Sequence, residues 1–254
     1  MTGGYDPSHF ARLVAVEDRH FWFRARNRII SLLAGQAVAE LGAGYRVLEV
    51  GCGDGNVLRF LDKACPEGVV VGMDYFREGL AYARGRCSCP LVQGDLKLPP
   101  FRKTFHLIGI FDVLEHLPDD RQVLHDLWRL LDAQGRLLLT VPADPALWSA
   151  FDEAACHCRR YRKEELEQKL KECGYLVEYL TPYMAATYPL VWLSRRLGKG
   201  SGPDEMVRSV ERDLRVIPVL NWMLSVVLSQ EIQWIRRRRQ LPTGTSLLAV
   251  ARKA

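Results

Sequence analysis

Three glycines and one acid form the segment of this chain best suited to binding a small ligand. Gly51, Gly53 and Gly55 stand at every second position, and Glu49 lies two residues before the first of them. Glycine tolerates positive φ and lets a ligand approach the backbone closely, as in dinucleotide-binding turns. A carboxylate at position 49 would repel phosphates and attract an ammonium or sulfonium group. The segment therefore favours a cationic ligand.

Apolar periodicity places this segment between a strand and a helix. Residues 46–50 are an apolar run typical of a buried strand, and Val57, Leu58 and Leu61 follow at helical spacing. The dinucleotide pattern G-x-G-x-x-G is not met, because Asn56 stands where its last glycine or alanine belongs. A nicotinamide-dependent oxidoreductase stays open as an alternative, disfavoured also by the lack of a Tyr-x-x-x-Lys pair.

Three further acids follow the next predicted strands. Asp74 comes directly after the apolar run 69–73, about 20 residues beyond the glycines, the spacing at which an acid can bridge ribose hydroxyls. Tyr75 comes next and could cover one face of an adenine ring. Asp95 and Asp112 follow the third and fourth runs. Each acid alone is typical of a helix cap or a turn, but four in this order favour a nucleoside site.

In this order the motifs resemble those of class I S-adenosylmethionine-dependent methyltransferases of the type 11 group. Residues 49–55 look like the first motif of that family, E-x-G-x-G-x-G, and 112–118 resemble its fourth motif. The resemblance covers 20–181 and 245–254 and implies S-adenosylmethionine as the cofactor. The cofactor site that we expect comprises Trp22, Arg26, Glu49, Gly51, Cys52, Gly53, Gly55, Asp74, Tyr75, Asp95, Leu96, Phe111 and Asp112.

Two pairs of residues in that set are predicted from the resemblance alone. In the family, the positions of Asp95 and Leu96 lie beside the adenine ring. A W-x-x-x-R pattern forms a helix over the cofactor, so Trp22 and Arg26 would cover it or bind its carboxylate. A helix that simply packs on the sheet is the alternative. Aromatics alternating with arginines over 20–28 could also bind nucleic acid, but no Asn-Pro-Pro-Tyr, Asp-Pro-Pro-Tyr or Pro-Cys occurs.

The methyl acceptor is expected to meet residues 147–161, directly after the fifth predicted strand. This stretch resembles an L-W-S-x-x-D-E-x-x-x-H-x-R-R-Y pattern of uncharacterised type 11 methyltransferases. A hydroxyl or carbon-acid acceptor must lose a proton, which a His or Asp can take. We expect catalytic roles for Asp152, His157 and Tyr161, and substrate binding by His116, Trp148 and Arg160. A hydrogen bond from His157 that only fixes the loop is the alternative.

The order of elements predicts an α/β fold. Alternating strands and helices indicate a Rossmann-like seven-stranded sheet with helices on both faces, and the last two strands, 175–180 and 246–251, indicate an antiparallel edge. The resemblance implies the strand order 3-2-1-4-5-7-6. We expect one class I methyltransferase domain over 1–254, with a mainly helical insertion at 182–244 that shapes the acceptor site.

Within that insertion, the sequence predicts a hinge at 198–203, a charged helix at 204–215 and an apolar helix at 216–235. The apolar stretches of the last piece are too short to span a bilayer, so a helix packed on the domain is expected. Peripheral membrane contact through 216–239 is the alternative, because Arg236–Arg239 follow directly. Because the nucleic-acid methyltransferase motifs are absent, a small-molecule or a lipid- or glycan-linked acceptor is expected.

Composition sets broader limits. The 254 residues carry a net charge of +5 and show no leader segment, which favours a cytoplasmic protein. Seven cysteines in such a chain do not indicate disulfides, and the spacing of Cys87-Ser-Cys89 and Cys156-His-Cys158 does not fit zinc motifs, so no metal is expected. Basic runs at 159–163 and 236–239 are typical of solvated faces. A regulatory or scaffold protein that binds the cofactor and uses these arginines for docking stays open as an alternative. The sequence does not indicate an oligomeric state.

Overall fold

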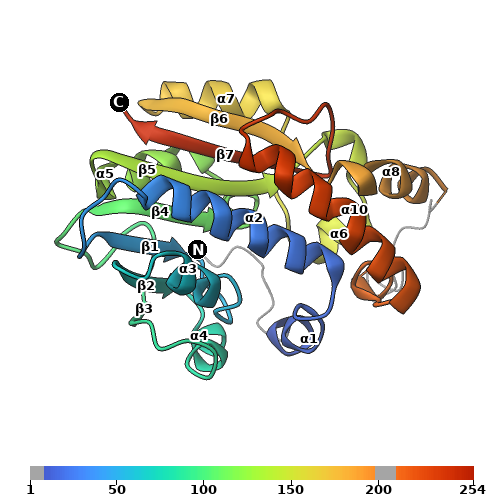
Figure 1. Ribbon diagram of the computed structural model, residues 1–254, viewed down its shortest axis with the longest axis horizontal. Coiled ribbons are helices and arrows are strands. Elements are labelled where there is room, and N and C mark those ends of the chain that lie inside the picture. The colour runs from blue at the N-terminus through green and yellow to red at the C-terminus, as the bar shows by residue number, and fades with distance from the viewer. Residues whose placement is uncertain (1–8, 198–209) are drawn as a thin grey trace.

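The computed structural model, which describes residues 9–197 and 210–254, is built around one seven-stranded sheet (Figure 1). The strand order is β3-β2-β1-β4-β5-β7-β6, as expected, and β7 runs antiparallel to both of its neighbours. The strands are β1 (Arg46–Val50), β2 (Val69–Asp74), β3 (Leu91–Gln93), β4 (Phe105–Phe111), β5 (Leu131–Pro142), β6 (Tyr175–Tyr183) and β7 (Ser246–Lys253).

Helices cover both faces of the sheet. Successive strand residues point to opposite faces, so Val47 packs with α2, α3 and α10 in one core while Leu48 packs with α5 and α7 in the other. The described α-helices are α1 (His9–Val16), α2 (Phe21–Val38), α3 (Leu58–Ala64), α4 (Arg77–Ala83), α5 (Asp120–Leu130), α6 (Ala150–Ala154), α7 (Lys163–Glu172), α8 (Tyr188–Leu197) and α10 (Pro218–Arg236).

Helix α10 confirms the helix expected at 216–235 and lies alongside α2 (Figure 1). The Asn221 side chain accepts a 2.7 Å hydrogen bond from the backbone N–H of Phe21, at the start of α2. The Gln36 side chain donates to the Arg236 carbonyl, 3.2 Å away, near the end of both helices. The two helices therefore run parallel over their whole length. Leu228 of α10 is buried against the domain.

Strand β5 contains a bulge, because Phe105 pairs with Leu131 whereas Leu107 pairs with Arg136. The predicted hinge at 198–203 lies outside the described residues, and so does most of the charged helix at 204–215. Of that helix, 210–214 are described and are helical.

Among the helices at 9–197 and 210–254, none combines the length and the apolarity that crossing a bilayer requires. All seven cysteines fall within the described part of the chain, and no disulfide joins any two of them.

Candidate functional site

The turn after β1 can be made only with glycine. Gly51, Gly53 and Gly55 have φ values of 71°, 50° and 78°, in the left-handed region that other residues rarely adopt. A Cβ on Gly51 would lie 2.4 Å from a methyl carbon of Val113. A Cβ on Gly55 would lie 2.9 Å from the Cβ of Ala83. Conformation and space both require glycine, and the turn leaves its backbone without side chains at the end of β1.

Glu49 stands beside this turn with an unsatisfied charge. Its side chain is 2% exposed, and its Oε2 has no hydrogen-bond partner within the described structure. Burial raises the pKa of Glu49 well above its usual value, which the guanidinium of Arg26 only partly opposes. Leaving a buried carboxylate oxygen without a partner costs free energy. A cation or a hydrogen-bond donor would therefore satisfy this atom.

Asp74, the last residue of β2, connects the glycine turn to the second strand. Its Oδ2 accepts from the N–H of Gly53 and its Oδ1 from the N–H of Phe76, both at 2.7 Å. Burial raises the pKa of Asp74 against these hydrogen bonds. Each oxygen keeps a second lone pair, so Asp74 can still accept from ribose hydroxyls. Tyr75 next to it is 45% exposed and its ring meets Phe76 edge to face.

The other residues expected around the adenosine lie on neighbouring strand ends. Asp95 follows β3 in a turn, where its Oδ1 accepts from the N–H of Lys97 at 2.9 Å. Leu96 is half-buried and packs against the core on the α5 and α7 face of the sheet. Cys52 and Phe111 are buried behind the glycine turn. These positions surround the ends of β1, β2, β3 and β4, which is where ligands bind to open α/β sheets.

Arg26 and Trp22 lie in the first turns of α2 and face the end of β4. Nη1 of Arg26 forms an ion pair with Oδ2 of Asp112 at 2.7 Å, and its Cζ lies 4.9 Å from the centre of the Trp22 ring. Burial disfavours the charge on Arg26, but Asp112 outweighs it and raises the pKa of the guanidinium. The W-x-x-x-R residues therefore reach the site, with Arg26 already engaged by Asp112.

Helix α1 also belongs to the site, and the sequence analysis did not predict it. The ring of Phe10 would lie 3.1 Å from a Cβ on Gly53 and 2.8 Å from one on Gly79. Phe10 therefore rests directly on the glycine turn. The signal that could have revealed it is the spacing of Phe10, Leu13 and Glu17, which all turn to one side of a helix.

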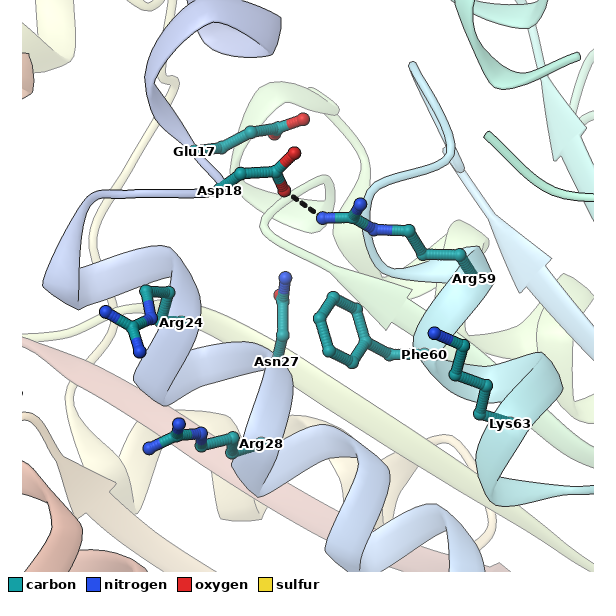
Figure 2. Close-up of a pocket in the computed structure, with 8 residues that line it drawn as sticks. All are labelled: Glu17, Asp18, Arg24, Asn27, Arg28, Arg59, Phe60 and Lys63. Atoms are coloured by element: carbon teal, nitrogen blue, oxygen red, sulfur yellow. Dashed lines mark hydrogen bonds and ion pairs between the residues drawn. The ribbon is translucent and has the colours of Figure 1, made fainter. Parts of the chain in front are cut away.

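Charged side chains fasten the end of α1 to the domain. Glu17 pairs with Arg86, whose Nη1 also lies 3.1 Å from Oδ2 of Asp54. Burial, followed by the charge of Asp54, raises the pKa of Glu17 to about 7. Figure 2 shows the second fastening, in which Asp18 pairs with Arg59 of α3. The pocket drawn there, about 280 Å³, lies between α2, α3 and the residues that follow α1.

The segment after β5 is held together by one buried carboxylate. Oδ1 of Asp152 lies 2.8 Å from Nδ1 of His157 and accepts from Nε of Arg160 at 2.7 Å. Oδ2 of Asp152 accepts from the N–H of Ser149 at 3.0 Å. Burial would raise the pKa of Asp152, but His157 and Arg160 outweigh it and lower the pKa. The loop-fixing hydrogen bond of His157 is therefore present, and Asp152 has no oxygen left over for a substrate proton.

The other acceptor candidates separate into two groups. Tyr161 is fully buried, and its hydroxyl donates to Asp120 at 2.9 Å, so it lies in the core. Arg160 donates hydrogen bonds to Asp152 and, over 3.0 Å, to the Ala143 carbonyl, so it also stabilises the loop. Trp148 is partly exposed at the same end of the sheet.

His116 and His157, by contrast, face each other with ring centres 4.8 Å apart. Burial and the adjoining His157 lower the pKa of His116 to about 4, so its ring is neutral at pH 7. Glu115, beside His116, was not among the expected site residues. Its presence in the D-x-x-E-H run after β4 was the available signal.

Comparison with known proteins places these features in a family. Residues 17–180 match the model of the methyltransferase domain. A probable S-adenosylmethionine-dependent methyltransferase of Mycolicibacterium smegmatis is 28% identical over 165 residues, which cover 63% of this chain and 62% of that protein. The chain thus spans about three fifths of the length of this relative.

Solved structures share the fold. The complex between the Haloferax volcanii Trm112 methyltransferase activator and a putative methyltransferase contains a chain with a TM-score of 0.60 at 18% identity, covering 97% of this chain and 94% of that one. Haemonchus contortus phosphoethanolamine N-methyltransferase 2, in complex with S-adenosylmethionine, gives a TM-score of 0.57 at 18% identity, covering 89% and 52%. At these identities the likeness shows the fold alone.

The residues present fit the cofactor that the relatives use. Glu49 offers a buried oxygen without a partner in the described structure, the glycine turn has no side chains that would keep a ligand from its backbone, and Asp74 can accept from hydroxyls. The family model matches well over half of the chain. The chain therefore belongs to the methyltransferase domain family, and its cofactor is S-adenosylmethionine.

Proposed function

We propose that this protein is a methyltransferase that moves the methyl group of S-adenosylmethionine to a small-molecule or lipid- or glycan-linked acceptor. The observation that carries the proposal is the buried Oε2 of Glu49, which has no partner in the described structure and stands beside three positive-φ glycines. A sulfonium cofactor supplies a methyl group that needs no further activation. The protein therefore has mainly to align the two reactants and exclude water.

Each group of residues has a distinct part in that alignment. Glu49 balances positive charge, and Asp74 accepts from the ribose hydroxyls. Phe10 and Trp22 close the site from the side of α1 and α2 and keep water out. The acceptor meets the ends of β4 and β5, next to His116 and the half-buried His157.

A lipid-linked acceptor is favoured by the outer face of α10. Val219, Trp222 and Val226 recur at helical spacing and are exposed, Trp222 by 67%. Figure 1 shows that the first half of α10 extends past the ends of β4 and β5. Arg236 and Arg237 are exposed at the other end of the helix. An exposed apolar stripe on a helix that ends in arginines suits an anionic membrane surface, where a lipid-linked acceptor would lie.

Calorimetry tests the cofactor site first. The protein is titrated with S-adenosylmethionine and with its demethylated product, and we expect binding of both in the micromolar range. Glu40→Gln, an exposed carboxylate at the end of α2, serves as the matched control for changes at Glu49. No binding of either compound at millimolar concentration would rule the proposal out.

The acceptor class is tested with a labelled methyl group. The protein is incubated with methyl-labelled S-adenosylmethionine and either the lipid extract or the aqueous extract of a bacterial lysate. Label in a solvent-extractable product supports a lipid-linked acceptor, and label in a water-soluble product supports a small molecule. Tight cofactor binding without any labelled product would instead favour a regulatory or scaffold protein.

A further inference from the structure

Three side chains that transition metals prefer as ligands meet at the ends of β4 and β5. Glu115 and His116 belong to the short helix η1 (Leu114–His116), and His157 follows α6. One ligand atom of each lies within 4.8 Å of the others. Ligand atoms about 2.1 Å from an ion are about 3.4 Å apart in a tetrahedral site, so the widest pair has to close by up to about 1.4 Å. The three side chains are therefore near one another and have to rearrange slightly to bind an ion.

His157 is oriented as a metal ligand by a second group. Asp152 accepts from Nε of Arg160 and from the N–H of Ser149, which identifies it as an ionised carboxylate. A carboxylate cannot donate, so Nδ1 of His157, 2.8 Å from Asp152, carries the hydrogen. The lone pair of the neutral ring is then on Nε2. A carboxylate behind a histidine is the arrangement that fixes ring orientation in metal sites.

Glu115 supplies a second, independent observation. It is 1% exposed, yet its Oε2 has no hydrogen-bond partner within the described part of the protein. Buried carboxylate oxygens are almost always paired, and a cation is the partner that satisfies them best. The backbone carbonyl of Glu115 accepts from the N–H of Cys158 at 2.7 Å, which ties η1 to the segment that carries His157. The three ligands are thus held together without an ion.

We propose that Glu115, His116 and His157 bind a divalent transition-metal ion. Two imidazoles and one carboxylate suit Mn²⁺, Fe²⁺ or Zn²⁺, whereas Ca²⁺ and Mg²⁺ prefer sites made of oxygen alone. Three protein ligands also leave coordination positions open for a further molecule. The absence of a metal was expected only from the spacing of the cysteines, and none of these three ligands is a cysteine.

The role of the ion rests on the proposed function. An open metal site beside the cofactor turn would hold the oxygen of a hydroxyl acceptor and lower its pKa. The acceptor oxygen then gives its proton to solvent and bonds to the methyl carbon, while the electron pair of the broken C–S bond stays on sulfur. His157 would serve as a ligand in this scheme and not as the general base.

Electron paramagnetic resonance with Mn²⁺ alone tests the site, because bound Mn²⁺ loses the sharp signal of the free ion. Manganese avoids thiolates, so nearby Cys156 and Cys158 do not compete. We expect about one ion per chain, and at least about 10-fold weaker binding in His116→Gln and in His157→Gln. Asp152→Asn should weaken binding about 10- to 100-fold by releasing the ring of His157.

His125→Gln is the matched control, because this half-buried histidine of α5 stacks on Trp128 away from the site. It should bind Mn²⁺ as the unchanged protein does. Thermal melting of every variant shows that it is folded. The metal site is refuted if the unchanged protein binds no Mn²⁺ at millimolar concentration, or if folded His116→Gln and His157→Gln bind as tightly as it does.

Calorimetry with S-adenosylmethionine in metal-free buffer separates this inference from the proposed function. A protein that binds the cofactor but no Mn²⁺ lacks the metal site and keeps the proposed activity. A protein that binds Mn²⁺ but neither the cofactor nor its product keeps the metal site and loses the proposed activity.

Discussion

Buried carboxylates of this protein differ in how many hydrogen-bond donors reach them. Both oxygens of Asp152 accept hydrogen bonds from its own loop, and these bonds lower its pKa. Glu49 and Glu115 each have one oxygen that nothing in the described structure reaches, and burial raises the pKa of both. A satisfied carboxylate stabilises the native loop, whereas an unsatisfied one costs free energy until a ligand arrives. Function is therefore expected at Glu49 and Glu115.

Glu49→Gln tests this argument at the cofactor turn. The amide keeps the shape of the side chain but removes its charge, so the affinity for S-adenosylmethionine should fall about 10- to 100-fold, as for loss of a charged hydrogen bond. The free energy of unfolding should stay the same or rise, because a buried charge disappears. Calorimetry and chemical denaturation measure the two effects. Unchanged affinity in Glu49→Gln would contradict the assignment.

Tyr161 allows a test of the opposite kind. Its hydroxyl donates to Asp120, and burial raises its pKa far above the usual value. Tyr161→Phe should therefore lower the free energy of unfolding by about 1 kcal/mol and leave the cofactor affinity unchanged. Denaturation with urea and calorimetry measure these. A variant of normal stability that no longer methylates its acceptor would support the catalytic role expected from the sequence.

The sequence predicted those site residues whose roles follow from their position directly after a strand. The turn at Gly51–Gly55 and the acids after the strands follow from local pattern and from the family resemblance. The sequence did not predict that hydrogen bonds occupy both oxygens of Asp152, or that Glu115 lies close to His157. His116 and His157 are 41 positions apart in the chain, and only the folded sheet brings the ends of β4 and β5 together. Local pattern carries no information on such contacts.

At the scale of elements, α1 behaves as a cover for the glycine turn. Phe10 rests on Gly53, and the end of the helix depends on the buried pair of Glu17 with Arg86. The sequence predicted neither this cover nor the parallel course of α10 along α2, because both depend on contacts between distant segments. The hydrogen bond between Phe21 and Asn221, for example, joins residues 200 positions apart.

The cover should respond to pH through Glu17. Its pKa is about 7 in the docked helix and 4.5 as the ordinary value, so the docked state holds the proton more tightly. Docking is therefore favoured most at low pH and weakens as the pH rises from 4.5 to 7, by about 3 kcal/mol at most. Hydrogen exchange of the amides of α1, corrected for intrinsic rates, measures this at pH 5.5 and 8.0.

Glu17→Gln removes the titrating group and keeps the hydrogen-bonding shape. In this variant, protection of the α1 amides should no longer change between pH 5.5 and 8.0. Glu40→Gln should retain the pH dependence of the unchanged protein. Equal protection at both values in the unchanged protein would mean that Glu17 does not control the helix.

At the scale of the whole molecule, the groups that do chemistry gather at one end of the sheet. The glycine turn, the histidine pair and the first half of α10 all lie where β1, β4 and β5 end (Figure 1). Most exposed apolar residues of α10 lie in its first half, and Trp234 lies near its other end. Those of the first half are Val219, Leu220, Trp222, Met223, Val226 and Val227. A membrane that contacts this stripe would present its lipids close to the site.

Flotation with vesicles of phosphatidylcholine and phosphatidylglycerol tests this arrangement. Burying one large apolar side chain contributes about 2–3 kcal/mol, so Trp222→Ser should weaken vesicle binding about 30- to 100-fold. Leu176→Ser, which changes a half-exposed apolar residue on β6, should have no effect. Added salt should weaken binding further, since Arg236 and Arg237 contribute through charge. If the unchanged protein does not float, or Trp222→Ser floats equally well, the stripe does not bind membranes. Sedimentation as a dimer that Trp222→Ser dissociates would show instead that a second copy covers it.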